Sequence, residues 1–395
     1  MEELFGGVFG RGAGLGDQAW LGAMLEVEAG LARALERAGL ASAGSGDFVT
    51  EVAVARNFDA AELGELAALT GNPVPGLARL LTRAVAVVDP DAARAVHHGA
   101  TSQDIIDTAA MLLARRAMDV TLADLGPAAS AAAALADAHR GSVMIGRTLL
   151  QQAVPVTFGL TAAGWLSGLD AALSGLRTVR SERLAVQFGG AAGTLASLGP
   201  DGPRVAALLA AELGLANPPL PWHTERLRII DAATALARVT AVTGKIARDV
   251  TLLAQNEVGE VREGDPRRGG SSSMPHKNNP VASIAILGCA RQVPGLLATL
   301  VASAEQEHQR AAGAWHAEWE PFTVVANLAS SAAAWTNDLL SGLRVDTARM
   351  AANLEAANAG TERIEATLDP SACLGASDEF VTAALRAHEE EEASG

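Results

Sequence analysis

The stretch IIDAATALARVTAVTGKIARDVTLL, residues 229–253, places apolar or small side chains at alternating intervals of three and four residues. This spacing is typical of a helix that packs along one side against other helices. No proline interrupts the chain between Pro221 and Pro266, so a helix here can reach roughly 50 Å. Since a chain of 395 residues seldom buries a helix that long, we expect a bundle shared between several copies. The positions with this spacing are Ile229, Ala232, Leu236, Val239, Thr243, Ile246, Val250 and Leu253.

The same spacing continues beyond the apolar run to Glu257 and Glu260. Two interpretations remain open. Either the helix has left the core and both glutamates are solvated, or the end of the helix faces a polar site.

The composition points to helices. Apolar residues make up 49% of the chain, charged residues 19% and aromatic residues 4%, and tyrosine is absent. This apolar share is sufficient for a large core. Alanine and leucine favour helix, and the scarcity of aromatic side chains argues against a β-sandwich or barrel. We therefore predict an all-α protein with a long central helical bundle.

Turn signals divide the chain into three parts. Residues 1–100 contain Asn72–Pro75 between short helical stretches and predict a small N-terminal helical domain. Residues 101–345 hold the long proline-poor runs of the predicted bundle. Residues 346–395 have a weaker pattern, and their acidic end, Glu389–Glu392, is predicted to be a disordered tail.

Charge and cysteine content exclude several classes of protein. A formal net charge of -15 argues against a nucleic-acid partner. The two cysteines, Cys289 and Cys373, offer neither a disulfide framework nor metal-ligand spacing. The start of the chain lacks the basic and apolar regions of a signal peptide, and no apolar run approaches the length of a membrane span. We expect a cytoplasmic protein without a membrane segment.

The segment GGSSSMPHKNNP, residues 269–280, concentrates groups that can bind an anion. Two glycines and three serines supply backbone N–H groups and hydroxyls, while Pro275 and Pro280 prevent a simple helix. Lys277 adds a cation and Asn279 an amide. Such a loop suits carboxylate binding and closure over a site. The alternative is an ordinary Gly/Ser linker, which rarely combines these residues so densely.

This loop closely resembles the signature of the fumarase/aspartase superfamily, Gly-Ser-Ser-x-Met-Pro-x-Lys-x-Asn-Pro, at all eight specified positions. The resemblance implies that Ser271 is the catalytic acid or base. It also implies that Lys277 acts in catalysis beside it, and that Asn279 binds a substrate carboxylate. Met274 and His276, in the same motif, are implied to contact the substrate.

The segment HHGATSQD, residues 97–104, resembles the first signature region of that superfamily. There, Thr and Ser at the start of a helix donate hydrogen bonds to a carboxylate. The resemblance implies that His97, Thr101 and Ser102 bind the substrate. Elementary physics agrees, because hydroxyls and unpaired N–H groups at a helix N-terminus form an anion site. The simpler interpretation, that Ser102 only caps a helix, is compatible.

The segment GRTLLQQAVP, residues 146–155, resembles the second region. Fumarases and adenylosuccinate lyases have Gly-Arg-Thr-His there, whereas this chain has Leu149 in place of the histidine. A leucine cannot transfer protons, and this departure favours the cycloisomerases of the superfamily. The resemblance implies that Thr148 and Gln152 bind the substrate.

Three further segments resemble the cycloisomerases: QFGGAAGTL (187–195), WHTER (222–226) and AGAWHAEW (312–319). The resemblance implies that Arg226 binds the substrate and that Glu257 supports the site from behind. Three histidines lie in or near these segments without an assigned role: His98, His223 and His316.

The resemblance implies a lactonisation that interconverts 3-carboxy-cis,cis-muconate and 4-carboxymuconolactone in protocatechuate catabolism. It implies no cofactor and no metal, and a homotetramer whose active sites are built from three chains. An adenylosuccinate lyase, or another C–O or C–N lyase of the superfamily, is the alternative enzyme. A non-catalytic helical scaffold that keeps the fold is the alternative from a different class.

The superfamily normally continues into a third helical domain after the segment that here ends at Leu354. Residues 368–385 resemble the last part of that domain. We therefore expect a shortened C-terminal region.

Overall fold

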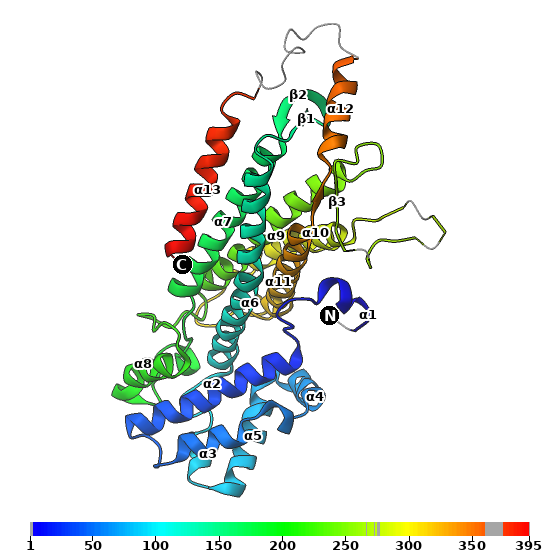
Figure 1. Ribbon diagram of the computed structural model, residues 1–395. Helices are drawn as coiled ribbons and strands as arrows, with labels where there is room; N and C mark the ends of the chain where they lie inside the picture. Colours follow the sequence, from blue (N-terminus) through cyan, green and yellow to red (C-terminus); the bar gives the residue numbers. More distant parts are fainter. Residues whose placement is uncertain (1–2, 266, 272, 275–276, 360–373, 395) are drawn as a thin grey trace.

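The structure is a computed structural model that describes residues 3–265, 267–271, 273–274, 277–359 and 374–394. Within these residues the chain is mostly helical, as the composition predicted (Figure 1). The helices are α1 (Glu3–Phe9), α2 (Asp17–Ala38), α3 (Ser45–Val52), α4 (Ala60–Thr70), α5 (Val74–Val88), α6 (Ser102–Ala138), α7 (Phe158–Glu182), α8 (Gly202–Leu213), α9 (Leu227–Leu253), α10 (Val281–Ala302), α11 (Trp319–Ser341), α12 (Thr347–Ala359) and α13 (Ser377–Ser394). The strands are β1 (Val143–Thr148), β2 (Gln151–Thr157), β3 (Val261–Arg262) and β4 (Arg344–Val345).

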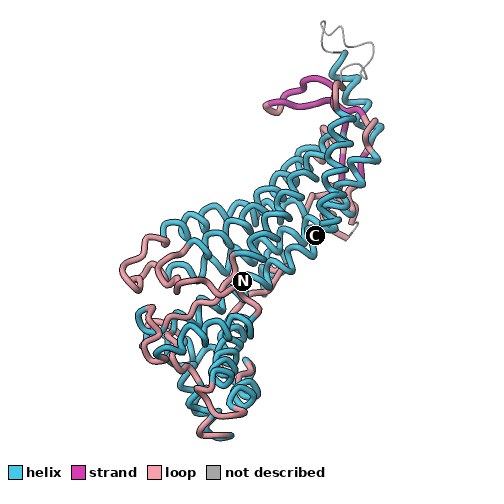
Figure 2. The backbone as a smooth tube through the Cα atoms, turned by 90° about the vertical axis from the view of Figure 1, so that its left-hand side faces the viewer, coloured by secondary structure: helices cyan, strands magenta, loops and turns pink. Residues whose placement is uncertain are grey.

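The long helices α6, α7, α9, α10 and α11 lie side by side and form the central bundle (Figures 1 and 2). Helix α9 covers the predicted stretch, and every regularly spaced position named above is buried. These side chains pack against α7, α10 and α11 of the same chain. The spacing predicted the helix correctly. The chain's own helices cover this stripe, so its burial gives no evidence for or against the shared bundle, which stays a prediction.

Helices α2–α5 gather at one end of the bundle, whereas α1 lies beside α10 and α11 (Figure 1). Helix α2 packs on α3, α6 and α8, and it buries Leu25, Leu31 and Leu35 completely. This arrangement places α2 directly against the first turns of α6. The packing of α2 on α6 therefore fixes the N-terminal helices against the start of the bundle.

The two sheets lie toward the opposite end of the bundle (Figure 2). Strands β1 and β2 form an antiparallel hairpin, and β3 pairs with β4, also antiparallel. Leu149 and Leu150 form the hairpin turn with φ angles of 53° and 65°. Positive φ at both central residues gives a two-residue turn the twist of the flanking strands. The turn projects outward, and Leu149 is 96% exposed.

The C-terminal end corrects one prediction. Glu389–Glu392 were expected in a disordered tail, but they belong to α13, which packs on α7 and α6. The reason is a set of partners on those helices. Arg177 pairs with Glu391 at 2.9 Å, and the buried His388 places Nδ1 2.9 Å from Asp170. Of residues 368–385, which resemble the last part of the superfamily's third domain, residues 368–373 lie outside the described residues, and the rest lead into α13.

Helix α10 is the one helix in the described part that is long and apolar enough to cross a membrane, judged by length and composition alone. A core helix of a soluble protein passes the same test. Here α10 belongs to the central bundle, but it leaves Ile284 and Val301 more than half exposed. An apolar side of α10 therefore faces outward from the single chain.

Candidate active site

The residues implied by the resemblance lie in three places in one chain. Thr101 and Ser102 stand at the start of α6, whereas Thr148 and Gln152 stand in the hairpin that follows its end. Helix α6 has 37 residues, so these two places are about 55 Å apart along it. The loop with Ser271 connects β3 to α10 near the hairpin end (Figure 1). One chain does not bring the three groups together.

The start of α6 is locked by its own sequence. Thr101 and Asp104 form a capping box, in which the Asp104 carboxylate accepts the Thr101 backbone N–H at 3.0 Å. This device satisfies N–H groups that the first turn leaves unpaired. Thr101 is thus the cap, and Ser102 is the first helical residue, half-buried at the end of the bundle.

Asp104 also holds two distant segments against α6. Its fully buried carboxylate accepts the backbone N–H groups of Gly189 and Gly190 at 3.0 and 2.8 Å. His223 places Nε2 2.7 Å from the same carboxylate. The cycloisomerase-like segments 187–195 and 222–226 therefore meet at Asp104. The motif contained Asp104, but nothing in the sequence showed that it is their shared partner.

Arg226, predicted to bind the substrate, is buried in the single chain. Its side chain is 1% exposed and lies between two buried carboxylates. Nε and Nη2 donate to Glu318, while Nη1 and Nη2 donate to Asp107, and Nη1 also reaches the His223 carbonyl. All five N–H donors of the guanidinium are therefore occupied. Arg226 is a structural centre of this end of the bundle.

The surroundings of Arg226 form a continuous buried network. Burial lowers the pKa of the Arg226 guanidinium, but Asp107 and Glu318 outweigh this effect and raise it. Burial raises the pKa of Glu318, and the pairing with Arg226 opposes that rise. Trp315 donates Nε1–H to Asp107 at 2.9 Å. Among the three unassigned histidines, His223 belongs to this network, whereas His98 and His316 are exposed.

His97 is held just before α6 by a carboxylate from α2. Glu28 is fully buried, accepts the His97 backbone N–H at 2.9 Å and lies 2.7 Å from Nδ1. The backbone of His97 has a φ of 57°, in the left-handed region that non-glycine residues seldom adopt. Burial lowers the pKa of His97, but the hydrogen bond and charge of Glu28, with the charge of Asp104, outweigh it and raise the pKa. This arrangement favours an imidazolium at the start of α6.

The hairpin presents its two predicted residues to the outside. Thr148 and Gln152 are exposed, and Gln152 lies directly opposite Arg147 in the hairpin register. Arg147 donates two hydrogen bonds of 2.9 Å to Glu260, which is fully buried. Glu260 also accepts from Asn353 at 2.8 Å. This pair ties the hairpin to the segment that leads into the loop.

Glu257 and Glu260 thus behave differently. Glu257 is exposed, and its backbone carbonyl accepts from Arg349 at 3.0 Å. Glu260 is buried and paired with Arg147. Both residues follow the end of α9 at Leu253, so the helical spacing does not extend to them; Glu257 is solvated, as the first interpretation stated, and Glu260 is buried in an ion pair. The spacing alone could not separate them.

The loop is tied at both ends of its stem. Before it, Glu263 accepts the backbone N–H groups of Ala282 and Ser283 at 3.0 and 2.9 Å, at the start of α10. Across the stem, Asn279 donates its backbone N–H and Nδ2–H to the Gly269 carbonyl at 2.9 and 3.0 Å. Asn279, predicted to bind substrate, therefore also closes the loop stem.

The part of the loop that is predicted to act in catalysis is largely open to solvent in the single chain. Ser271 Oγ accepts the Met274 backbone N–H at 3.2 Å and lies 3.5 Å from Ser273 Oγ. Met274 and Lys277 are exposed, and His276 lies outside the described residues. A serine hydroxyl is a poor base without a group that stabilises its alkoxide. The described partners of Ser271 do not include such a group.

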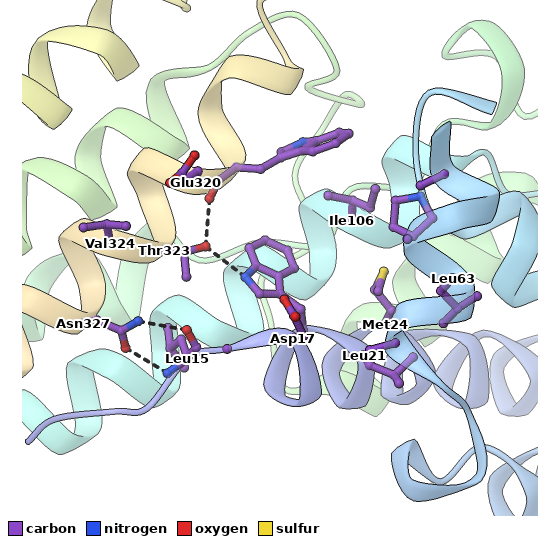
Figure 3. Close-up of a pocket in the computed structure, with 17 residues that line it drawn as sticks. Leu15, Asp17, Leu21, Met24, Leu63, Ile106, Glu320, Thr323, Val324 and Asn327 are labelled. Carbon is purple, nitrogen blue, oxygen red and sulfur yellow. Dashed lines mark hydrogen bonds between the residues drawn. The ribbon is translucent and has the colours of Figure 1, made fainter. Parts of the chain in front are cut away.

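A pocket of about 530 Å³ lies between α2, α4 and α11, beside Ile106 of α6 (Figure 3). Its wall is largely apolar, with Trp20 donating Nε1–H to Thr323 at 2.9 Å. Asp17 and Glu320 are its charged residues, and none of the described residues that line it is Lys, Arg or His. Two carboxylates without a cation disfavour an anionic ligand. This pocket is therefore not a candidate for the carboxylate site.

Comparison with known proteins agrees with the motifs. The chain matches the family described as Lyase over residues 15–295. It is 49% identical to a 3-carboxy-cis,cis-muconate cycloisomerase of Bradyrhizobium diazoefficiens, over 86% of this chain and 76% of that protein. It is 44% identical to a nitrosuccinate lyase of Streptomyces davaonensis, over 91% of this chain and 78% of that protein.

A solved structure shows the same architecture. The 3-carboxy-cis,cis-muconate lactonizing enzyme from Pseudomonas putida superposes with a TM-score of 0.91 and 35% identity. The match covers 99% of this chain and 100% of that one. The resemblance seen in the sequence motifs is confirmed: the chain belongs to the lyase family of the fumarase/aspartase superfamily.

Proposed function

We propose that the protein is an intramolecular lyase that interconverts 3-carboxy-cis,cis-muconate and 4-carboxymuconolactone. The observation that carries the proposal is its similarity to several cycloisomerases of this substrate, at 49% identity in Bradyrhizobium diazoefficiens and 45% in Pseudomonas aeruginosa. The presence of Leu149 where related lyases have histidine supports the same choice.

The reaction needs few chemical groups from the protein. One carboxylate of the substrate attacks a carbon of its own chain, and the adjacent carbon, α to a second carboxylate, takes up a proton. All atoms of the substrate are retained, and the product gains this one proton. The protein must hold three carboxylates and stabilise the charge that develops on one of them, which preorganised donors do most effectively. Ser271 is our candidate for the proton transfer and Lys277 for the charge stabilisation.

We further propose that the working enzyme is a homotetramer with sites shared between chains. Three observations support it. The first motif is separated within one chain from the hairpin motif by the length of α6, so a complete site requires other copies. Ser271 has no stabilising partner among its described contacts. Finally, exposed apolar side chains such as Ile284, Val301 and Leu149 offer surface for association.

The remaining expectations follow from the same assignment. The substrate is a small tricarboxylate, and the acidic chain is not expected to bind nucleic acid. The proposed place of action is the cytoplasm, where such a catabolic reaction would need neither a cofactor nor a membrane.

A second candidate is a C–N lyase acting on a substituted succinate. The nitrosuccinate lyase of Streptomyces davaonensis matches a larger share of this chain than the Bradyrhizobium cycloisomerase does, 91% against 86%, at 44% identity. Such an enzyme would also bind carboxylates and move a proton beside one of them. The motifs therefore do not separate the two reactions.

An absorbance assay decides between them. Purified protein is mixed with 3-carboxy-cis,cis-muconate, and loss of the conjugated diene is followed in the ultraviolet. Parallel reactions contain nitrosuccinate, with nitrite as the measured product, or adenylosuccinate. Turnover of carboxymuconate that disappears in Ser271→Ala supports the proposal. Turnover of nitrosuccinate alone would replace it with the second candidate, and activity on none of the three would favour the non-catalytic scaffold.

A further inference from the structure

The short sheet of β3 and β4 places two arginines opposite each other. The antiparallel register pairs Val261 with Val345 and Arg262 with Arg344. Directly opposed residues share one face of a sheet, and successive residues alternate between faces. Val261 is buried, whereas both arginines are exposed. The two guanidinium groups therefore leave the same side of this sheet.

No counter-charge accompanies this pair in the described part of the chain. Arg262 and Arg344 have neither a side-chain hydrogen bond nor an ion pair with any described residue. Nearby arginines differ: Arg147 is paired with Glu260, and Arg349 donates to two backbone carbonyls. Like charges directly opposite each other destabilise a strand pair. In a chain of net charge -15, two opposed arginines without a described partner are a candidate site for an anion.

Both arginines line a polar pocket of about 520 Å³. Asn256, Asn278 and Thr347 add side chains that can donate hydrogen bonds. Two acidic residues also line the pocket, but their carboxylates are already engaged. Glu263 accepts from the start of α10, and Asp346 accepts the Arg349 backbone N–H at 2.9 Å at the start of α12. Both carboxylates keep their charge, but each is directed to backbone N–H groups at a helix start. The lining side chains without a described partner are the two guanidinium groups and those of Asn256, Asn278 and Thr347.

We propose that Arg262 and Arg344 form a binding site for a small oxyanion with at least two negative charges. Two guanidinium groups on one face match such an ion, because each can donate two parallel hydrogen bonds to its oxygens. A bound oxyanion also removes the repulsion between the two arginines. The anion is either a phosphate or a compact polycarboxylate, since both carry paired anionic oxygens.

The pocket lies where the stem of the loop meets the C-terminal region. Its lining includes Glu263, just before the loop, and Asn278, at the end of the loop, as well as the start of α12. An anion bound there bridges the two ends of the loop stem to the C-terminal region. Asn279, predicted to bind substrate, also lines this pocket, whereas Ser271 does not. The binding of an oxyanion here does not require the proposed reaction.

The test uses the full chain and measures binding of inorganic phosphate by titration calorimetry at low ionic strength. The variant Arg262→Gln/Arg344→Gln removes both charges. A matched control, Arg56→Gln/Arg79→Gln, removes the same net charge at two exposed arginines far from the pocket. We expect one phosphate per wild-type chain, unchanged binding in the control and at least about tenfold weaker binding in the pocket variant. Equal binding by the wild type and the pocket variant would overturn the site.

Two further measurements strengthen the test. Phosphate should raise the Tm of the wild type and the control but not of the pocket variant, which also shows whether each variant is folded. Citrate in place of phosphate ranks the two kinds of anion, and tighter binding of either one supports the site and names its class. If instead phosphate raises the KM for carboxymuconate at unchanged kcat in the wild type alone, the arginines belong to the substrate site and a separate site is ruled out.

Discussion

Glu28 holds His97 by two contacts, although the residues are 69 positions apart. One joins the carboxylate to the His97 backbone N–H at 2.9 Å, and the other joins it to Nδ1 at 2.7 Å. Because a carboxylate accepts hydrogen bonds, Nδ1 carries the hydrogen, and Nε2 remains available for another partner. The contact fixes both the unusual backbone of His97 and the orientation of its ring. Helix α2 thereby sets the geometry at the start of α6.

Replacing Glu28 by glutamine tests whether this contact serves substrate binding. Glutamine keeps the shape and one acceptor but removes the charge that favours imidazolium. We expect Glu28→Gln to raise the KM for carboxymuconate about tenfold at nearly unchanged kcat, because an ionic contact to a carboxylate is lost in ground and transition states alike. The control is Glu26→Gln on the same helix, where Glu26 pairs with Arg116 away from His97. Unchanged KM in Glu28→Gln would remove His97 from the substrate site.

The same pair predicts a pH dependence of stability. Burial lowers the pKa of His97, but Glu28 and Asp104 outweigh it and raise the pKa above the usual 6.5. Protonated His97 therefore contributes stability that is fully present below pH 6.5 and is lost as the pH rises through the raised value. The Tm of the wild type should exceed that of Glu28→Gln most at pH 6 and less at pH 8. A difference that stays constant over this range would show that the charge on His97 has no part in the contact.

The role of Arg226 can be separated from substrate binding by measuring unfolding. Arg226→Met leaves Asp107 and Glu318 buried without their cation, and breaking a buried pair in this way costs about 3–5 kcal/mol. We expect a large fall in the denaturant midpoint and in Tm. Arg267→Met, which removes an exposed arginine paired with Asp265, should leave both nearly unchanged. Normal stability of Arg226→Met with a raised KM would restore the substrate-binding role that the motif implied.

The sequence predicted features that depend on residues close together in the chain, and it did not predict contacts between residues far apart. Local spacing predicted α9 within a few residues, and the composition predicted the helical fold. The contact of Asp104 with His223 joins residues 119 positions apart, so no local pattern contains it. The buried pair of Arg147 and Glu260 spans 113 positions in the same way. The motifs supplied the residue types of the site, and the fold supplied their partners.

The same limit applies to the C-terminal tail, where the prediction was wrong, and to the surroundings of Arg226. Arg226 is in a cycloisomerase-like segment, but a segment does not tell whether its arginine faces a ligand or two buried carboxylates. The acidic run Glu389–Glu392 has a composition typical of disorder, yet Arg177 on α7 gives it a partner that only the folded chain brings near. In both cases the environment of a charge, rather than the charge itself, decided the outcome.

Ser271→Ala tests the proton transfer directly. The hydroxyl accepts only the Met274 backbone N–H and lies near Ser273, so its removal should change stability by less than about 0.5 kcal/mol. If the hydroxyl handles the proton, kcat should fall by at least about a hundredfold. Ser273→Ala, two residues further along the same loop, is the control and should keep most of the activity. A near-normal kcat in Ser271→Ala would move the acid–base role to another group.

The separation of the three motifs predicts complementation between inactive variants. His97→Asn and Ser271→Ala each remove one group, and asparagine tolerates the left-handed backbone of His97. If one site takes His97 from one chain and Ser271 from another, a mixed oligomer contains some sites with both groups intact. Equal amounts of the two variants are unfolded together and refolded. If subunits assemble at random, half of the chains that supply each group carry it intact, so about a quarter of the wild-type activity should return. Assayed well below the wild-type KM, each variant refolded alone should stay far below this level, and the recovered activity should coelute with an oligomer in size-exclusion chromatography with light scattering. Mixed oligomers that form without any activity would mean that both groups come from the same chain. The proposal of a site shared between chains would then be wrong. A stable monomer at micromolar concentration would contradict the shared site outright.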